Sequence, residues 1–86
     1  MSLQDDFKKA AERSKTDIKE RPSNEELLKL YAFYKQGDEG DVSGERPGGF
    51  DFKAIAKYDA WAELKGMSSE DAMKAYIELV DTLASA

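Results

Sequence analysis

Tyrosine and lysine occur side by side in two separate segments, a pattern that could bind a phosphate group and a flat ring. In the first segment Tyr31 and Tyr34 are three residues apart, and Lys35 comes four residues after Tyr31. Residues with these spacings share one side of a helix. Farther along the chain, Lys57 is followed directly by Tyr58. Because ammonium groups suit phosphates and tyrosine rings suit aromatic bases, we expect a local site for a nucleotide-like ligand.

The composition restricts the chemistry that the chain can perform. Its 86 residues include no histidine and no cysteine. The commonest general base, the commonest metal ligand and any thiolate or disulfide are therefore missing. Carboxylates remain, but they are scattered among lysines as on a solvated surface. We therefore expect a binding protein with no metal and no cofactor, and we give an enzyme that uses carboxylates little weight.

The charge balance limits the partners that the chain can attract. A net charge of -5 disfavours general attraction to nucleic acid or to anionic lipid, so a polyanion must be bound by a local cluster of bases. No apolar run approaches the roughly 20 residues of a membrane-spanning helix. The first residues lack the apolar core of a signal peptide. We therefore expect a cytoplasmic protein with no nucleic-acid partner and no stable membrane insertion.

Hydrophobic periodicity predicts a single all-α domain over residues 1–86. Apolar residues recur every three or four positions in four segments, which is the pattern of amphipathic helices. The expected helices cover about residues 3–15, 23–36, 51–66 and 68–83. Ser23 with Glu26, and Ser68 with Asp71, have the spacing of helix-capping boxes. No segment alternates with the period of two that a strand requires.

The segment from residue 37 to residue 50 has no hydrophobic period and holds five of the six glycines. Loops of this length in compact domains are uncommon and often functional. Its acidic, glycine-rich sequence suggests calcium binding, which requires an oxygen ligand at loop position five and glycine at position six. Counting from Asp38, these positions hold Val42 and Ser43. A flexible acidic loop is the better interpretation.

Several segments, taken in order and spacing, resemble one known family. They are Tyr31-Ala32-Phe33-Tyr34-Lys35-Gln36, Gly40-Asp41, Arg46-Pro47-Gly48, Lys57-Tyr58-Asp59-Ala60-Trp61, and Gly66-Met67-Ser68 with Glu70, Ala72 and Tyr76. With residues 7–11 included, the chain resembles the acyl-CoA-binding proteins over essentially its whole length. The resemblance implies a four-helix up-down-down-up bundle with a long loop between helices 2 and 3. It also implies a non-catalytic intracellular carrier and pool-former that binds long-chain fatty acyl-CoA thioesters.

The resemblance further implies roles for individual residues in binding the CoA head group. Tyr31 and Lys35 match the positions that meet the adenine ring and the ribose 3′-phosphate. Lys57 matches a third-helix lysine at the same phosphate, and Tyr76 matches a fourth-helix tyrosine near the nucleotide. Two further lysines, Lys15 and Lys53, match positions that contribute to the head-group site.

For the acyl chain, the resemblance implies a groove bounded by the second and third helices that touches Leu27 and Leu28. Tyr34 lies on a core-like stripe of the second helix, and the pattern leaves it open between core packing and ligand contact. Trp61 is expected in the core because its large ring adds much buried area to a small domain. Arg46, in the loop, is expected to be structural or solvated.

Two residues depart from the family pattern. Tyr58 stands where the family usually has tryptophan, and Ile55 stands where it often has lysine. These departures and the acidic balance support an alternative, a helical protein-interaction module that has kept the fold but lost the ligand. We expect a monomer, because few apolar residues remain for a subunit interface, with acyl-CoA-using enzymes as further partners.

Overall fold

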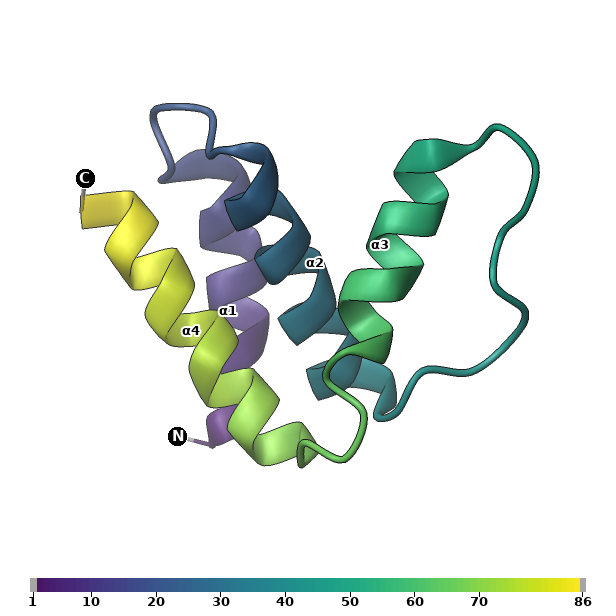
Figure 1. Cartoon of the computed structure of the whole chain (residues 1–86). Helices are drawn as coiled ribbons and strands as arrows, with labels where there is room; N and C mark the ends of the chain where they lie inside the picture. The colour runs from purple at the N-terminus through teal and green to yellow at the C-terminus, as the bar shows by residue number, and fades with distance from the viewer. Residues whose placement is uncertain (1, 86) are drawn as a thin grey trace.

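Four helices account for most of the computed structural model, which describes residues 2–85 (Figure 1). They are α1 (Leu3–Thr16), α2 (Asn24–Glu39), α3 (Phe52–Ala62) and α4 (Ser69–Ser85). In the view of Figure 1, α1 and α4 run upward while α2 and α3 run downward. A long connection separates α2 from α3. The expected all-α, four-helix up-down-down-up arrangement is confirmed.

Side-chain caps define where the helices begin. Ser23 Oγ accepts a hydrogen bond from the Glu26 N–H at 3.1 Å, and Glu26 Oε1 accepts one from the Ser23 N–H at 2.9 Å. This pair is the capping box that the sequence predicts. Asp51 caps α3 through one such bond, and Ser68 Oγ accepts from the Asp71 N–H at 3.0 Å at the start of α4. These side chains satisfy N–H groups that have no partner inside the first helical turn.

The predicted end of the second helix at residue 36 is wrong, because α2 continues to Glu39. Gly37, expected to open the loop, is buried inside the helix. A Cβ atom placed on it would lie 3.1 Å from both Met73 Cγ and Phe7 Cζ. Glycine is therefore present here for a close approach to α1 and α4, not for a turn. The helix ends instead at Gly40, whose φ of 85° suits a residue without a side chain.

The third helix is shorter than predicted, because regular α-helix ends at Ala62 and not near Gly66. The Leu64 N–H bonds to the Trp61 carbonyl at 3.0 Å, three residues back. Such bonds tighten the chain into 3₁₀-like turns at helix ends. The apolar pattern continues through this turn, which explains why periodicity alone extended the helix. The first helix ends at Thr16, one residue beyond the prediction.

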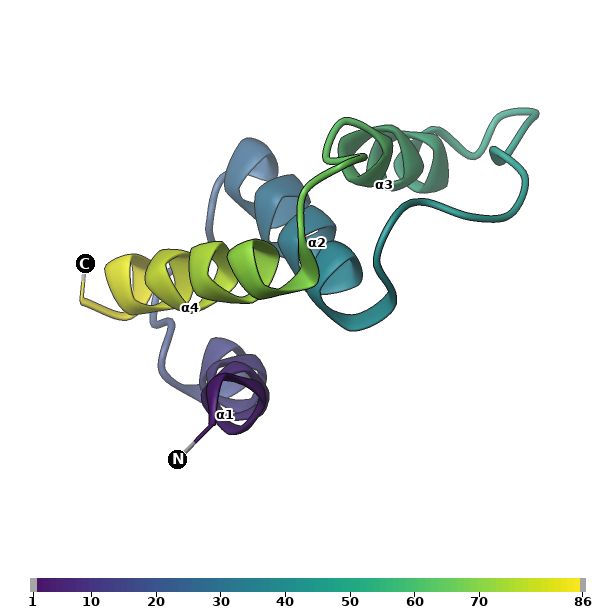
Figure 2. The ribbon, with the colours of Figure 1, turned by 90° about the horizontal axis from the view of Figure 1, so that it is seen from below.

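The core lies where α1 and α2 pack against α4, and α3 packs mainly against α2. Its buried residues are Phe7, Ala10, Met73, Tyr76 and Val80. Seen from below, α2 lies between α3 and α1 (Figure 2). The position of α3 therefore depends mainly on its packing against α2. None of the helices within residues 2–85 has the length and hydropathy needed to span a membrane.

Gly37→Val should destabilise the fold by about 1–3 kcal/mol, the usual cost of inserting extra carbon atoms into a packed core. The added side chain would meet Phe7 and Met73 at a distance already tight for one Cβ atom. Urea unfolding followed by circular dichroism measures the change. Gly48→Val, at a loop position with open space around it, is the control. An unchanged free energy of unfolding for Gly37→Val would show that the contact is not tight.

Stability should fall with pH below about pH 5, because several carboxylates are stabilised in their charged form. The Gly66 N–H and the Gln36 side chain hold the pKa of Asp41 below its usual value. The Arg46 guanidinium does the same for Asp59. A lowered folded-state pKa means that this stability is full above the unfolded value near 3.8 and is lost as pH falls through the folded value. Urea midpoints measured from about pH 5 to about pH 2 test this; a constant midpoint would contradict it.

Candidate functional site

Two contacts between a lysine and an aromatic ring join α2 to α3. Lys57 Nζ, from α3, lies 5.4 Å from the ring centroid of Tyr31 on α2. Lys35 Nζ, from α2, lies 4.9 Å from the ring centroid of Trp61 on α3. Both distances fit cation–π attraction. Tyr31 and Lys35 are one helical turn apart, as are Lys57 and Trp61, so the two contacts lie side by side across the interface. We call these four residues the lysine–aromatic cluster.

Trp61 has a second role beside the core packing that the sequence predicts. Its side chain is buried, with 5% exposure, which agrees with a core residue. Its ring also supports Lys35, and its Nε1–H donates a hydrogen bond to the Gly40 carbonyl oxygen at 2.9 Å. Trp61 therefore fixes the end of α2 against α3 and forms one wall of the cluster. The sequence does not predict this role. Its only signal is the i, i+4 spacing between Lys57 and Trp61, which does not show that Trp61 meets Lys35 on another helix.

The two lysines of the cluster have different electrostatic surroundings. Lys35 forms an ion pair with Glu39, one turn farther along α2, and this hydrogen bond raises the pKa of Lys35 above its usual value. Lys57 forms no ion pair with any carboxylate in residues 2–85. Both side chains are partly buried. A positive charge that is partly shielded from water and has no acidic partner is suited to binding an anion.

A second aromatic group joins α1, α2 and α4. The rings of Phe7 and Tyr34 stack with centroids 5.2 Å apart, and Tyr76 meets Phe7 edge-on at 5.2 Å and Tyr34 at 5.6 Å. Tyr34 is 37% exposed, so its ring packs on the core from one side while part of it reaches solvent. Burial raises the pKa of Tyr76, whose hydroxyl donates to Ser14 Oγ at 3.3 Å. Of the three rings, only that of Tyr34 reaches solvent, because Phe7 and Tyr76 are buried.

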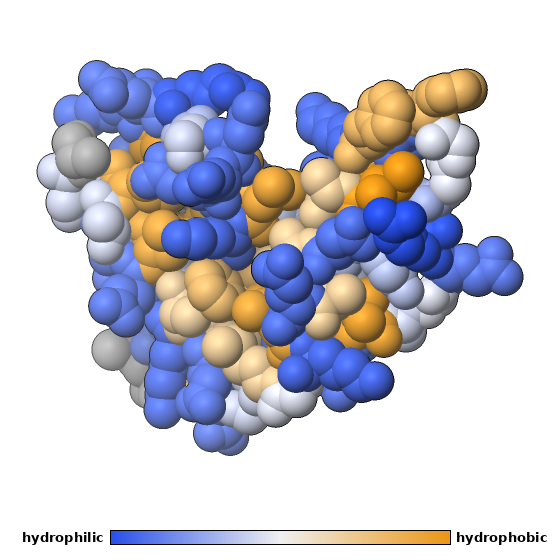
Figure 3. Space-filling model, viewed as in Figure 1, coloured by the Kyte–Doolittle hydropathy of each residue, from blue (hydrophilic) through white to orange (hydrophobic). Residues whose placement is uncertain are grey.

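Three hollows lie between the helices. One of ≈ 340 Å³ lies where α1 connects to α2 and is lined by Leu27, Tyr31, Tyr34 and Tyr76. Another of ≈ 380 Å³ lies between α2 and α3; its apolar lining is Leu28, Ala32, Phe33, Ala56, Ala60 and Leu64. On the face drawn in Figure 3, a notch with hydrophobic surface on both sides separates the part containing α3 from the rest. Leu27 and Leu28, predicted to touch one groove, therefore line two different hollows.

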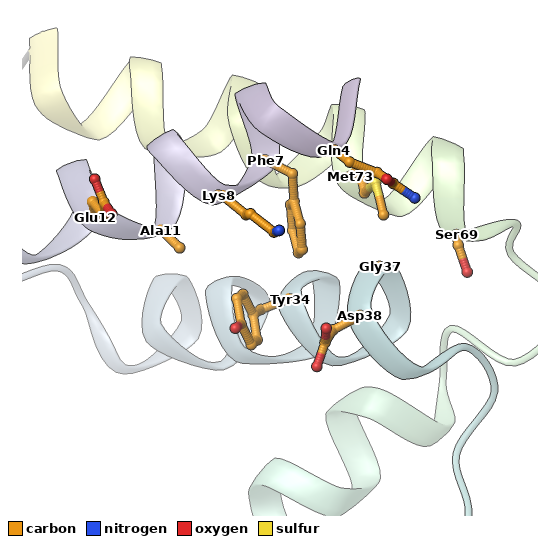
Figure 4. A pocket seen from close by; sticks show the side chains of 10 residues that line it. All are labelled: Gln4, Phe7, Lys8, Ala11, Glu12, Tyr34, Gly37, Asp38, Ser69 and Met73. Carbon is orange, nitrogen blue, oxygen red and sulfur yellow. The ribbon is translucent and has the colours of Figure 1, made fainter. Parts of the chain in front are cut away.

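The third hollow, of ≈ 650 Å³, lies between α1 and α2 near the start of α4. Figure 4 shows Phe7 pointing from α1 toward α2, beside Tyr34. Charged side chains, among them Lys8, Glu12 and Asp38, also line this hollow. This hollow is not predictable from the sequence, because its lining comes from three helices and depends on how they pack.

Lys15 and Lys53, the two remaining predicted residues, are exposed on the last turn of α1 and the first turn of α3. The part of the chain described by the structure offers them no ion-pair partner. They lie on different helices from each other, and within residues 2–85 neither lies over an aromatic ring. The structure thus gathers Tyr31, Lys35 and Lys57 closely, and leaves these two lysines at the periphery.

The loop between α2 and α3 is tied to α3 at several points. Arg46 donates two hydrogen bonds to the Asp59 carboxylate, at 2.8 Å and 2.9 Å. The Tyr58 hydroxyl donates to the Gly44 carbonyl oxygen at 3.1 Å. The expected structural role of Arg46 agrees with its ion pair. The loop is thus held against α3 by these bonds, which sequence spacing did not indicate.

Comparison with known sequences decides the family. The sequence model described as Acyl CoA binding protein matches residues 4–80. The chain belongs to the acyl-CoA-binding protein family. It is 53% identical over 77 residues to "Acyl-CoA-binding protein homolog 1" of Caenorhabditis elegans, covering 90% of this chain and 88% of that one. It is 48% identical over 84 residues to "Acyl-CoA-binding protein homolog" of Manduca sexta, covering 96% and 92% respectively.

Solved structures of this family have the same fold. The crystal structure of Oryza sativa Acyl-CoA-Binding Protein 2 matches with a TM-score of 0.91 and 43% identity, covering 98% of this chain and 92% of that one. The solution structure of the yeast acyl-coenzyme A binding protein matches with a TM-score of 0.74 and 47% identity, covering 92% and 91%. The resemblance that the sequence predicts is therefore confirmed for the family and for the fold.

Proposed function

We propose that this chain binds long-chain fatty acyl-CoA thioesters as a non-catalytic carrier and pool-former. The observation that carries the proposal is the lysine–aromatic cluster, in which two partly shielded ammonium groups lie over aromatic rings between α2 and α3. One of these rings, Tyr31, also lines a hollow with Leu27 and Leu30. Membership of the family supports the choice of ligand. An acyl-CoA has the matching halves, a phosphorylated nucleotide and a long hydrocarbon chain.

The head group occupies the polar half of the site in this proposal. Lys35 and Lys57 bind the 3′-phosphate through charge-assisted hydrogen bonds, and Tyr31 contacts the adenine ring. Tyr34 contributes its exposed ring surface, and Tyr76 lines the hollow beneath it. Lys15 and Lys53, both exposed, add positive charge around the phosphates. Because these charges are accessible to salt, binding of the head group weakens as ionic strength rises.

The acyl chain occupies the apolar half, along the hollow between α2 and α3 that Leu28 lines. Leu27 contacts the ligand near the tyrosines, in the neighbouring hollow. Each buried methylene contributes about 0.8 kcal/mol, so ~14 of them offer on the order of 11 kcal/mol before the cost of ordering the ligand. The acyl chain of the ligand, and not its head group, therefore supplies most of the affinity.

Affinity should rise steadily with acyl-chain length until the acyl chain covers all the apolar surface of the hollow between α2 and α3. Titration calorimetry with acyl-CoAs from about eight to about eighteen carbons measures this, with up to about 0.8 kcal/mol expected for each methylene that becomes buried. Free CoA should bind weakly and free palmitate little, since each offers one half of the ligand. Equal affinity at all acyl-chain lengths would contradict binding of the acyl chain in this hollow.

The interaction-module alternative has no observation in its favour. Tyr58 uses its hydroxyl to hold the loop, and the departures at Tyr58 and Ile55 leave the lysine–aromatic cluster in place. The proposal includes a monomer located in the cytoplasm that passes its ligand to acyl-CoA-using enzymes. Size-exclusion chromatography with light scattering tests the monomer; a stable dimer would contradict it.

A further inference from the structure

The last turn of α2 carries two acidic residues, Asp38 and Glu39, and no basic residue. The end of a helix bears partial negative charge from its unpaired carbonyl groups, so carboxylates there are locally unfavourable. Helix stability by itself therefore does not explain this pair of acids. Glu39 nevertheless has a specific contact, the ion pair with Lys35 one turn earlier.

This ion pair is held in a defined place. Lys35 Nζ lies over the Trp61 ring at 4.9 Å, and Trp61 Nε1 bonds at 2.9 Å to the carbonyl oxygen of Gly40, the residue next to Glu39. The ammonium group is thus bounded by an indole ring and a carboxylate. Lys57, the other lysine of the cluster, contacts Tyr31 and has no carboxylate partner within residues 2–85.

We propose that Glu39 is a built-in competitor for the ligand, whose carboxylate occupies Lys35 in the free protein and is displaced by a phosphate on binding. The inference rests on the proposed function, which assigns Lys35 to the 3′-phosphate of CoA. A phosphate carries more negative charge than a carboxylate and can contact Lys35 and Lys57 together, so it displaces Glu39 from Lys35. A ligand without this phosphate does not need Lys35 and therefore leaves the ion pair with Glu39 in place. Glu39 thereby lowers the affinity for the phosphorylated head group, and removal of its charge raises that affinity.

Glu39→Gln tests the proposal because the amide has nearly the same shape and no charge. The glutamate is exposed at the helix end, so the fold does not depend on it; urea unfolding checks this. We expect the variant to bind palmitoyl-CoA about three- to fivefold more tightly, since it loses an exposed ion pair and a nearby negative charge. Affinity for the 3′-dephospho analogue of palmitoyl-CoA should change by less than about twofold.

The matched control is Glu78→Gln, which removes the same charge from an exposed position on α4 and should leave both affinities unchanged. If the wild-type protein binds palmitoyl-CoA and Glu39→Gln binds it equally or more weakly, the competitor role is wrong and the proposed function stands. Equal tightening for both ligands overturns the assignment of the exchange to the 3′-phosphate. Failure of the wild-type protein to bind palmitoyl-CoA overturns the proposed function together with this inference.

Discussion

Lys57→Ala is expected to weaken the binding of palmitoyl-CoA about tenfold to a hundredfold, because hydrogen bonds to charged groups contribute about 1.5–3 kcal/mol. Lys57 lies 5.4 Å from the Tyr31 ring centroid and forms no ion pair in the part of the chain that the structure describes. Its charge is therefore available to the 3′-phosphate without a prior exchange. Titration calorimetry at low ionic strength measures the loss, which should shrink as salt is added.

The stability of Lys57→Ala separates a binding role from a structural one. Loss of the contact with Tyr31 should lower the free energy of unfolding by only about 0.5–1 kcal/mol, the usual strength of an exposed cation–π pair. Lys74→Ala, on an exposed position of α4, removes the same charge away from the cluster and should bind normally. Normal binding by Lys57→Ala would show that the phosphate lies elsewhere.

Phe7→Ala is expected to destabilise the protein by about 3–5 kcal/mol, as is usual when a buried phenylalanine is cut back to alanine. Phe7 is 5% exposed and packs against the rings of Tyr34 and Tyr76. Native proteins have only about 5–15 kcal/mol of stability in total, so this change removes a large part of it. Denaturant unfolding with a circular-dichroism readout measures the difference.

Phe50→Ala is the matched control for this prediction. Phe50 is 91% exposed, so its removal should change stability by no more than about 0.5 kcal/mol. The pair compares the same chemical change in two environments. A similar loss for both variants would mean that the α1–α2–α4 core does not depend on Phe7.

Local patterns predicted the helices well because each helix has one apolar stripe and begins with a capping side chain. Ser23 with Glu26 is the clearest case, since both bonds of the predicted capping box are present. The predicted helix ends were wrong where tertiary packing overrides local preference. Gly37 signals a turn by its type, yet it lies inside α2 because only a residue without a side chain fits against Phe7 and Met73.

The candidate site was predictable in its residue types and less so in its arrangement. The spacing of Tyr31 and Lys35 places them on one face of α2, but only the packing of α3 shows that Lys57 meets the tyrosine and Trp61 meets the lysine. Glu39 was missed because the predicted helix stopped at residue 36. With the helix extended to Glu39, the i, i+4 spacing from Lys35 predicts the ion pair directly.

The most direct test is isothermal titration calorimetry with palmitoyl-CoA, run beside free CoA and free palmitate. We expect one-to-one binding of palmitoyl-CoA that is much tighter than the binding of either half, because the phosphate and apolar parts of the site act on one ligand. Binding of none of the three compounds, by a protein whose circular dichroism shows the helical fold, would contradict it.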